Sequence, residues 1–210
     1  MKSLYIRVHP THPQTRLLAQ AAELVRHGAV IVCPTDACYS LACTVGDKTA
    51  EDRMRAIRQI ERDHHFTLLC RDLAEVALYA KVSNDAFRLI KTLSPGPYTY
   101  ILPATRETPR RLQDPKRRTV GMRISAHPFV HGLREQLDEP LLATTVLNDA
   151  IQLPYADPED IAEDIGHAVD AIIDAGAVGI EMTTIIDLCG PRPVLIRQGL
   201  GDVRHVAELS

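Results

Sequence analysis

Residues 15–34 read TRLLAQAAELVRHGAVIVCP, and this stretch indicates the class of the fold. Its leucines, alanines and Val25 recur at helical spacing as far as Gly28, a residue type that commonly ends helices. A short apolar, β-branched run follows and stops at Pro34, which is typical of a buried strand. A helix that leads straight into a buried strand predicts a helix packed on a sheet.

Helical and strand patterns continue to alternate along the chain. Further helices are predicted at 49–61, from 83 or 84 to 93, at 128–137, and after 157–158. Further strands are predicted at 66–70, 98–103, 119–124, 141–145, 170–174, 183–188 and 193–197. Because helices do not follow every strand, we expect an α/β fold with a mixed sheet. The 210 residues contain no internal repeat or linker, so a single domain over residues 1–210 is expected.

Composition narrows the location of the protein. Hydrophobic residues make up 45% and charged residues 24%, as in ordinary globular proteins. No run of about 18 apolar residues exists, so no membrane span is predicted. The first residues, MKSLYIRVHP, lack the apolar segment of a signal peptide. The five cysteines form no Cys-x-x-Cys pair, which indicates reduced thiols and a cytoplasmic protein.

The net charge is only −3, but the charges are unevenly placed. A basic block lies between residues 106 and 123, and its cations are Arg106, Arg110, Arg111, Lys116, Arg117, Arg118 and Arg123. Residues 135–190, in contrast, contain neither lysine nor arginine. Neighbouring cations repel one another unless an anion binds among them, so the block favours an anionic partner. A solvated loop without a partner is the alternative.

Residues 57–72, IRQIERDHHFTLLCRD, hold the densest group of reactive side chains. His64, His65 and Cys70 are candidate metal ligands, but adjacent histidines in an extended segment point to opposite sides. We therefore expect no metal site. The cysteines lie in or beside apolar runs, where burial raises the thiol pKa and suppresses reactivity. No phosphate-binding loop of the Gly-x-x-x-x-Gly-Lys-Ser/Thr type is present.

Hydroxyl and guanidinium groups recur at the predicted strand ends. They belong to Thr35, Thr119, Arg123, Thr144, Thr145, Thr183, Thr184 and Arg197. In an open α/β sheet the strand ends line the usual ligand crevice, and these groups suit a phosphate or a carboxylate. Each threonine alone is more often a strand former than a ligand, so the sequence leaves their convergence open.

Several of these segments, in order, resemble the YrdC-like family. They are PTDACYSLAC (34–43), SPGPYTYIL (94–102), TVGMRISAHP (119–128), LLATT (141–145) and TTIIDLCGPRPVLIRQG (183–199). The stretches RQIERDHHFTLLCRDL (58–73) and KRRTVGMR (116–123) are most similar to the YciO branch. The resemblance implies one twisted mixed sheet with flanking helices and a concave basic cavity. It also implies nucleotide binding and, in some members, binding of tRNA or double-stranded RNA.

The activity implied by the resemblance is L-threonylcarbamoyladenylate synthesis, a nucleotidyltransferase reaction that serves tRNA threonylcarbamoyladenosine modification. ATP, L-threonine and bicarbonate give threonylcarbamoyl-AMP and pyrophosphate. ATP would be a substrate, accompanied by Mg²⁺, and no tightly bound cofactor is implied. By resemblance, the threonine-binding residues are Thr35, Arg123 and Thr183. The nucleotide-binding residues are Arg58, which is also the implied catalytic cation, Thr119, Thr145 and Arg197.

The chain departs from the family pattern at several positions. The family's Lys-x-Arg pair aligns with Arg58-Gln59-Ile60, so one cation is replaced by isoleucine. The asparagine of Ser-x-Asn aligns with Leu147, and Cys70 stands where a histidine is frequent. Losing one transition-state donor costs about 10²–10³ in rate. We therefore expect weakened or altered activity, unless Arg62 or His64 supplies the missing charge.

The alternative is a non-catalytic protein of the same fold that binds double-stranded RNA or tRNA. Its expected RNA-binding residues are Arg110, Arg111, Lys116, Arg117 and Arg118. Aromatic residues make up only 4% of the chain, which argues against base stacking. A basic surface instead suits contacts with the RNA backbone.

Overall fold

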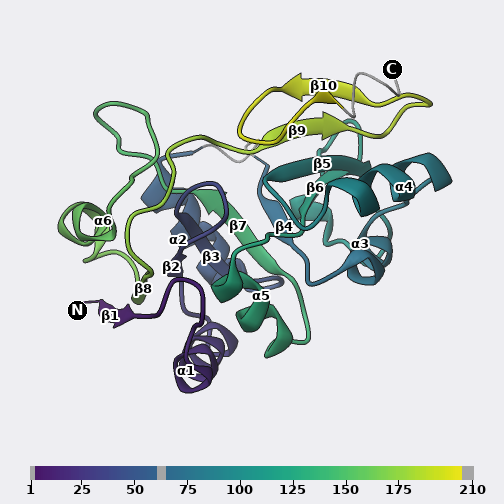
Figure 1. Cartoon of the computed structure of the whole chain (residues 1–210). Helices are drawn as coiled ribbons and strands as arrows, with labels where there is room; N and C mark the ends of the chain where they lie inside the picture. Colours follow the sequence, from purple (N-terminus) through teal and green to yellow (C-terminus); the bar gives the residue numbers. More distant parts are fainter. Residues whose placement is uncertain (1–2, 61–64, 205–210) are drawn as a thin grey trace.

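The computed structural model describes residues 3–60 and 65–204 (Figure 1). Its helices are α1 (Thr15–Arg26), α2 (Lys48–Arg58), α3 (Leu73–Tyr79), α4 (Asn84–Leu93), α5 (Pro128–Glu135) and α6 (Pro158–Ile165), with a 3₁₀ turn η1 (Arg110–Leu112). Its strands are β1 (Leu4–Arg7), β2 (Ile31–Cys33), β3 (Ser40–Thr44), β4 (Thr67–Leu69), β5 (Tyr98–Pro103), β6 (Thr119–Arg123), β7 (Leu141–Thr145), β8 (Ala171–Asp174), β9 (Thr184–Asp187) and β10 (Val194–Arg197).

All ten of these strands join one sheet in the order β1-β8-β2-β3-β7-β4-β6-β5-β9-β10. The pairs β1–β8, β2–β8, β4–β6 and β5–β9 are parallel, and the other neighbours are antiparallel. The predicted mixed sheet of an α/β fold is therefore confirmed. The extent of the domain over residues 1–210 stays a prediction.

The segment that indicated the fold class forms α1 and β2 as expected. Gly28 ends the helix region with φ +81, a left-handed backbone conformation that glycine adopts without strain. An added Cβ there would lie 2.6 Å from a carboxylate oxygen of Asp47, the residue that caps α2. Glycine at this position thus allows the start of α2 to pack against the end of α1.

Helices cover the sheet on two faces. On one face α1 and α5 enclose a buried cluster that includes Val25, Ile31 and Phe129. On the other face α2, α4 and α6 pack over a larger cluster that includes Met54 and Ile90. Side chains alternate between the two faces along each strand. The face that carries α1 and α5 therefore continues past these helices onto β7, β4, β5 and β9, and the main cavity described below lies there.

Most predicted elements are present, with shifted ends. The predicted helix at 49–61 is Lys48–Arg58, and Glu61 lies outside the described residues. The predicted helix at 128–137 ends at Glu135. The sequence patterns missed β1, β3 and α3. Within residues 3–60 and 65–204, no helix has the length and apolar character needed to cross a membrane.

Candidate active site

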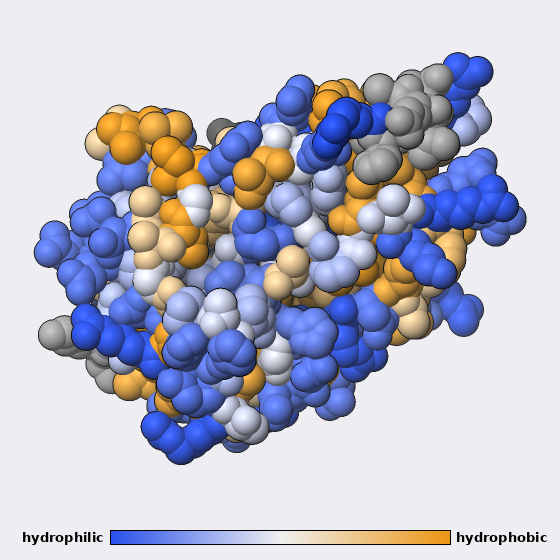
Figure 2. Space-filling view, in the orientation of Figure 1, coloured by the Kyte–Doolittle hydropathy of each residue, from blue (hydrophilic) through white to orange (hydrophobic). Residues whose placement is uncertain are grey.

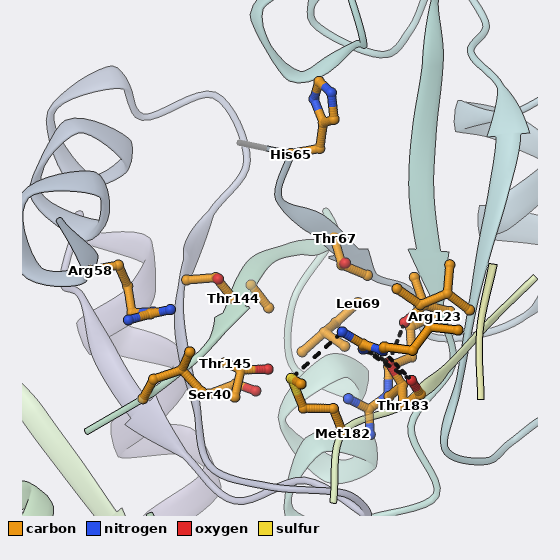
Figure 3. A pocket seen from close by; sticks show the side chains of 15 residues that line it. Ser40, Arg58, His65, Thr67, Leu69, Arg123, Thr144, Thr145, Met182 and Thr183 are labelled. Carbon is orange, nitrogen blue, oxygen red and sulfur yellow. Dashed lines mark hydrogen bonds between the residues drawn. The ribbon is translucent and has the colours of Figure 1, made fainter. Parts of the chain in front are cut away.

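The main cavity is a hollow of about 350 Å³ on the open part of the sheet. It is lined by Ser40, Arg58, His65, Thr67, Leu69, Thr99, Arg123, Ala143, Thr144, Thr145, Leu147, Met182, Thr183, Ile185 and Arg197. Figure 3 shows Arg58 on one side of the cavity, with Arg123, Met182 and Thr183 gathered on the other. Three of these described lining residues are arginines and none is an acid, so the cavity is electropositive.

Arg58 stands at the last position of α2 and is half-buried. Its Nε is buried and has no hydrogen-bond partner in the described part of the chain. Burial lowers the pKa of the Arg58 guanidinium, although the charge of Asp149 raises it in part. A desolvated guanidinium with an unused donor is the group that an incoming anion would stabilise.

Arg197 ends β10 and crosses to the segment before β9. Its Nε and Nη2 donate to the carbonyl oxygen of Thr183 at 3.2 and 3.0 Å, which anchors this segment beside the cavity. Burial is the largest cause of a lowered pKa for Arg197, and Cys38 opposes it. Its hydrogen bonds within residues 3–60 and 65–204 involve no carboxylate, so the charge of Arg197 remains available to an anion.

Arg123 ends β6 and is buried, with 5% of its surface exposed. Its Nη2 donates to Asp36 Oδ1 at 2.5 Å and to Thr35 Oγ1 at 3.2 Å. Thr35 is itself buried, and its hydroxyl donates to the carbonyl of Cys38 and accepts from the backbone of Ala37 and Cys38. Thr35 thus helps to position Arg123 through this hydrogen bond. A direct contact between Thr35 and the substrate threonine stays a prediction.

The predicted threonines lie in different parts of the site. Thr145 and Thr183 line the main cavity, and the Thr183 hydroxyl lies 2.9 Å from that of Thr99. Thr119 lines an adjoining cavity of about 320 Å³, which shares His65, Thr67, Thr99 and Ile185 with the main cavity. The structure therefore brings together five predicted residues in the main cavity: Arg58, Arg123, Thr145, Thr183 and Arg197. It places Thr119 in the adjoining cavity.

Sequence reasoning missed Ser40, Thr67, Thr99 and Met182 as lining residues. Thr99 carried a signal, because YTYILP alternates and its tyrosines face the core. Thr67 lies in the short run FTLLC, where a single hydroxyl gives no such pattern. Met182 lines the cavity through the irregular segment between β8 and β9, whose path no local pattern predicts.

The basic block forms a second hollow, the basic cavity. It has a volume of about 750 Å³ and is lined by Lys81, Pro103, Ala104, Thr105, Arg106, Arg110, Gln113, Arg117 and Arg118. Two predicted RNA-binding residues form ion pairs: Arg111, which does not line this cavity, pairs with Glu51, and Arg117, which does, pairs with Asp187, each at 2.5 Å. Arg117 also lines the adjoining cavity, so the basic cavity and the adjoining cavity meet at this residue.

The cysteines are buried or half-buried thiols. Burial raises the pKa of Cys33 and of Cys43 to about 12, and it raises the pKa of Cys38 and Cys70 as well. The expectation of unreactive thiols at these positions agrees with this direction. Among the residues described, no three His, Cys, Asp or Glu side chains gather in a way that could hold a metal ion. His64, one predicted metal candidate, lies outside them.

The fold is shared with a known family. Residues 23–199 match the Sua5/YciO/YrdC family model, described as telomere recombination, and the chain belongs to this family. It is 46% identical over 202 residues to a protein named uncharacterized protein YciO from Escherichia coli strain K12, covering 96% of this chain and 98% of that protein. The crystal structure of E. coli YciO superimposes with a TM-score of 0.92 over the same shares of the two chains.

Two more distant relatives have named functions or ligands. A threonylcarbamoyl-AMP synthase of Vibrio vulnificus strain YJ016 is 26% identical over 159 residues, which cover 74% of this chain and 84% of that protein. The structure of Pyrococcus abyssi Sua5 complexed with L-threonine superimposes with a TM-score of 0.90 at 25% identity. That match covers 98% of this chain and 60% of the Sua5 chain.

Proposed function

We propose that the main cavity binds ATP and L-threonine and makes threonylcarbamoyl-AMP at a reduced rate. One observation carries the proposal: Arg58, Arg123 and Arg197 line one cavity together with threonine hydroxyls. The three guanidinium groups offer charge-assisted hydrogen bonds to phosphates and to a carboxylate. The main and adjoining cavities, at about 350 and 320 Å³, have the size of small-molecule sites.

In the proposed reaction the amine of threonine and bicarbonate form a carbamate and release water. A carbamate oxygen then attacks the α-phosphorus of ATP, the bond to the β-phosphate oxygen breaks, and pyrophosphate leaves. Arg58 and Arg197 would hold phosphate oxygens and stabilise the charge that develops on them. Arg123 would hold the carboxylate of threonine. Mg²⁺ would enter with ATP.

The proposal is tested by pyrophosphate release from ATP. Release should require both L-threonine and bicarbonate, and the adenylate product should be detectable by mass spectrometry. The synthase of Vibrio vulnificus serves as a competent control, and Arg58→Ala should abolish the signal. The proposal fails if the wild-type protein, at enzyme concentrations close to those of the substrates, releases no threonine-dependent pyrophosphate while the control does.

RNA binding is a second candidate function, favoured by the basic cavity. Lys81, Arg106, Arg110, Arg117 and Arg118 line that cavity together and are mostly exposed. This arrangement suits the phosphates of a folded or double-stranded RNA. The Vibrio vulnificus relative is a threonylcarbamoyl-AMP synthase, which favours the first candidate as the main function. Binding of tRNA that weakens steeply with salt would support the second candidate, and no binding at low salt would refute it.

A further inference from the structure

Asp36 forms an ion pair with Arg123, the arginine of the main cavity that is proposed to hold the carboxylate of the amino acid. It follows Thr35 directly after β2 and Pro34, and its Oδ1 accepts from Arg123 Nη2 at 2.5 Å. The Ser125 hydroxyl donates to the same oxygen. The side chains of Arg123 and Asp36 are 7% and 13% exposed, so the pair is shielded from water.

The pair is incomplete in a specific way. Asp36 Oδ2 and Arg123 Nε are both buried, and neither has a hydrogen-bond partner in residues 3–60 and 65–204. An arginine and a carboxylate commonly form two parallel bonds, whereas this pair uses only one nitrogen and one oxygen. Buried polar atoms without partners are rare and usually have a functional reason. The Arg123 guanidinium is thus held through Nη2, and its Nε keeps an unused donor.

The other two arginines of the main cavity differ from Arg123. No ion pair with an acid is formed by Arg58 or Arg197 in the described part of the chain. Arg58 and Arg197 therefore have no carboxylate in direct contact, while the charge of Arg123 is balanced in part by Asp36. A fully charged guanidinium favours the multiply charged phosphates of ATP. A guanidinium whose charge is partly balanced attracts these phosphates less strongly and can still bind a single carboxylate.

We infer that Asp36 is a positioning residue that reserves Arg123 for the carboxylate of an amino acid and keeps phosphate away from it. This inference rests on the proposed function of the main cavity. Asp36 holds the guanidinium by Nη2, Ser125 fixes the Asp36 carboxylate, and Arg123 lines the cavity where the substrate would bind.

The kinetic test uses Asp36→Asn, which keeps the shape of the side chain and removes its charge. The KM for L-threonine should rise about tenfold or more, because the charge-assisted hydrogen bond that holds Arg123 in position is weakened. The KM for ATP should change less than about threefold, and inorganic pyrophosphate should become a stronger competitor of threonine. Ser125→Ala should give a smaller rise in the threonine KM. Asp170→Asn, which breaks a pair with Arg53 on another part of the fold, should leave both constants unchanged.

A second measurement does not depend on catalysis. The ¹⁵N–¹H resonance of Arg123 Nε, assigned with Arg123→Lys, should shift in Asp36→Asn and stay in place in Asp170→Asn. Circular dichroism confirms that each variant is folded. An unchanged resonance together with an unchanged threonine KM in Asp36→Asn would overturn the role of Asp36. Failure of the wild-type protein to bind threonine in calorimetry would instead overturn the proposed function, and the resonance would still report on the pair.

Discussion

The side-chain amide of Gln59 donates to a carboxylate oxygen of Asp149 across 2.8 Å, and this bond joins the end of α2 to the loop after β7. Gln59 has φ +50, in the left-handed region, so the chain turns sharply after Arg58. The turn separates two neighbours: Arg58 lines the main cavity, whereas Ile60 packs in part against the core. The position that the family resemblance aligns with a second cation is therefore used for apolar packing.

Replacing Ile60 with arginine should strengthen the proposed activity. The alkyl part of the arginine side chain can keep the packing of Ile60 against the core, while its guanidinium extends into the solvent beyond the end of α2. One added charge-assisted hydrogen bond to a phosphate would lower the KM for ATP about tenfold. Steady-state pyrophosphate release measures the change. Ile60→Met is the control without charge, and equal KM values for the two folded variants would contradict the prediction.

The space-filling view shows a polar middle on this face, with apolar residues gathered on the loop between β7 and α6 (Figure 2). That loop carries the exposed side chains of Ile151 and Leu153 and forms a bridge between Leu147 and Pro154.

The parts of the fold that could be predicted are those with local signals. The periodicity of α1, Gly28 at its end and the β-branched run of β2 all lie within twenty residues. The strand β1 could not be found in this way, because it is short and is held by β8, about 167 residues away in the sequence. The helix α3 was missed because its buried Glu75 resembles a surface residue until Arg134 is placed beside it.

The candidate site was predictable in its chemistry but not in its geometry. Strand-end positions and family resemblance led to Arg58, Arg123 and Arg197, which do line one cavity. Neither indicated that the Thr35 hydroxyl bonds to its own turn and to Arg123. Nor did they indicate that Arg111 turns away to pair with Glu51, because such ion pairs join segments far apart in the chain.

RNA binding at the basic cavity should depend on its exposed cations. Replacing Arg106, Arg110 and Arg118 together with glutamine should weaken tRNA binding, and the slope of log affinity against log salt should fall by about 0.9 for each phosphate that is no longer neutralised. Titrations from low to physiological salt measure this slope. The control is Lys91→Gln, an exposed cation in the last turn of α4. An equal slope in the triple variant and the wild type would exclude these three residues from binding RNA.

Breaking the buried ion pair of Glu75 and Arg134 should destabilise the protein strongly. Arg134 Nη2 donates to Glu75 Oε1 at 2.6 Å, and the two side chains are only 1% and 5% exposed. Glu75→Ala would leave a buried guanidinium without its carboxylate, at a cost of about 3–5 kcal/mol in the free energy of unfolding. The double variant Glu75→Leu with Arg134→Met should lose much less. Urea denaturation measures both, and equal losses would show that the charges do not act as a pair.

Acid should weaken the start of α5 through His127. The Nδ1 atom of His127 accepts a hydrogen bond from the backbone of Phe129 at 3.2 Å and so caps the helix. Burial is the main cause of a lowered pKa for His127; Arg123 also lowers it, and Asp36 raises it in part. The unfolded chain has the ordinary histidine pKa of about 6.5, so below this pH it binds more protons than the folded protein does. The free energy of unfolding therefore holds its full value above about pH 6.5 and falls as the solution becomes more acidic.

The variant His127→Asn isolates this effect. Its side-chain oxygen can accept the same bond from Phe129, and it does not titrate. Between pH 7 and pH 5.5 the wild-type protein should lose more of its free energy of unfolding than the variant, while at pH 7 the two should differ by about 1 kcal/mol or less. Urea denaturation at a series of pH values measures both curves. Carboxylates titrate alike in the two proteins and cancel in the difference, so parallel curves would show that His127 does not control the acid sensitivity of α5.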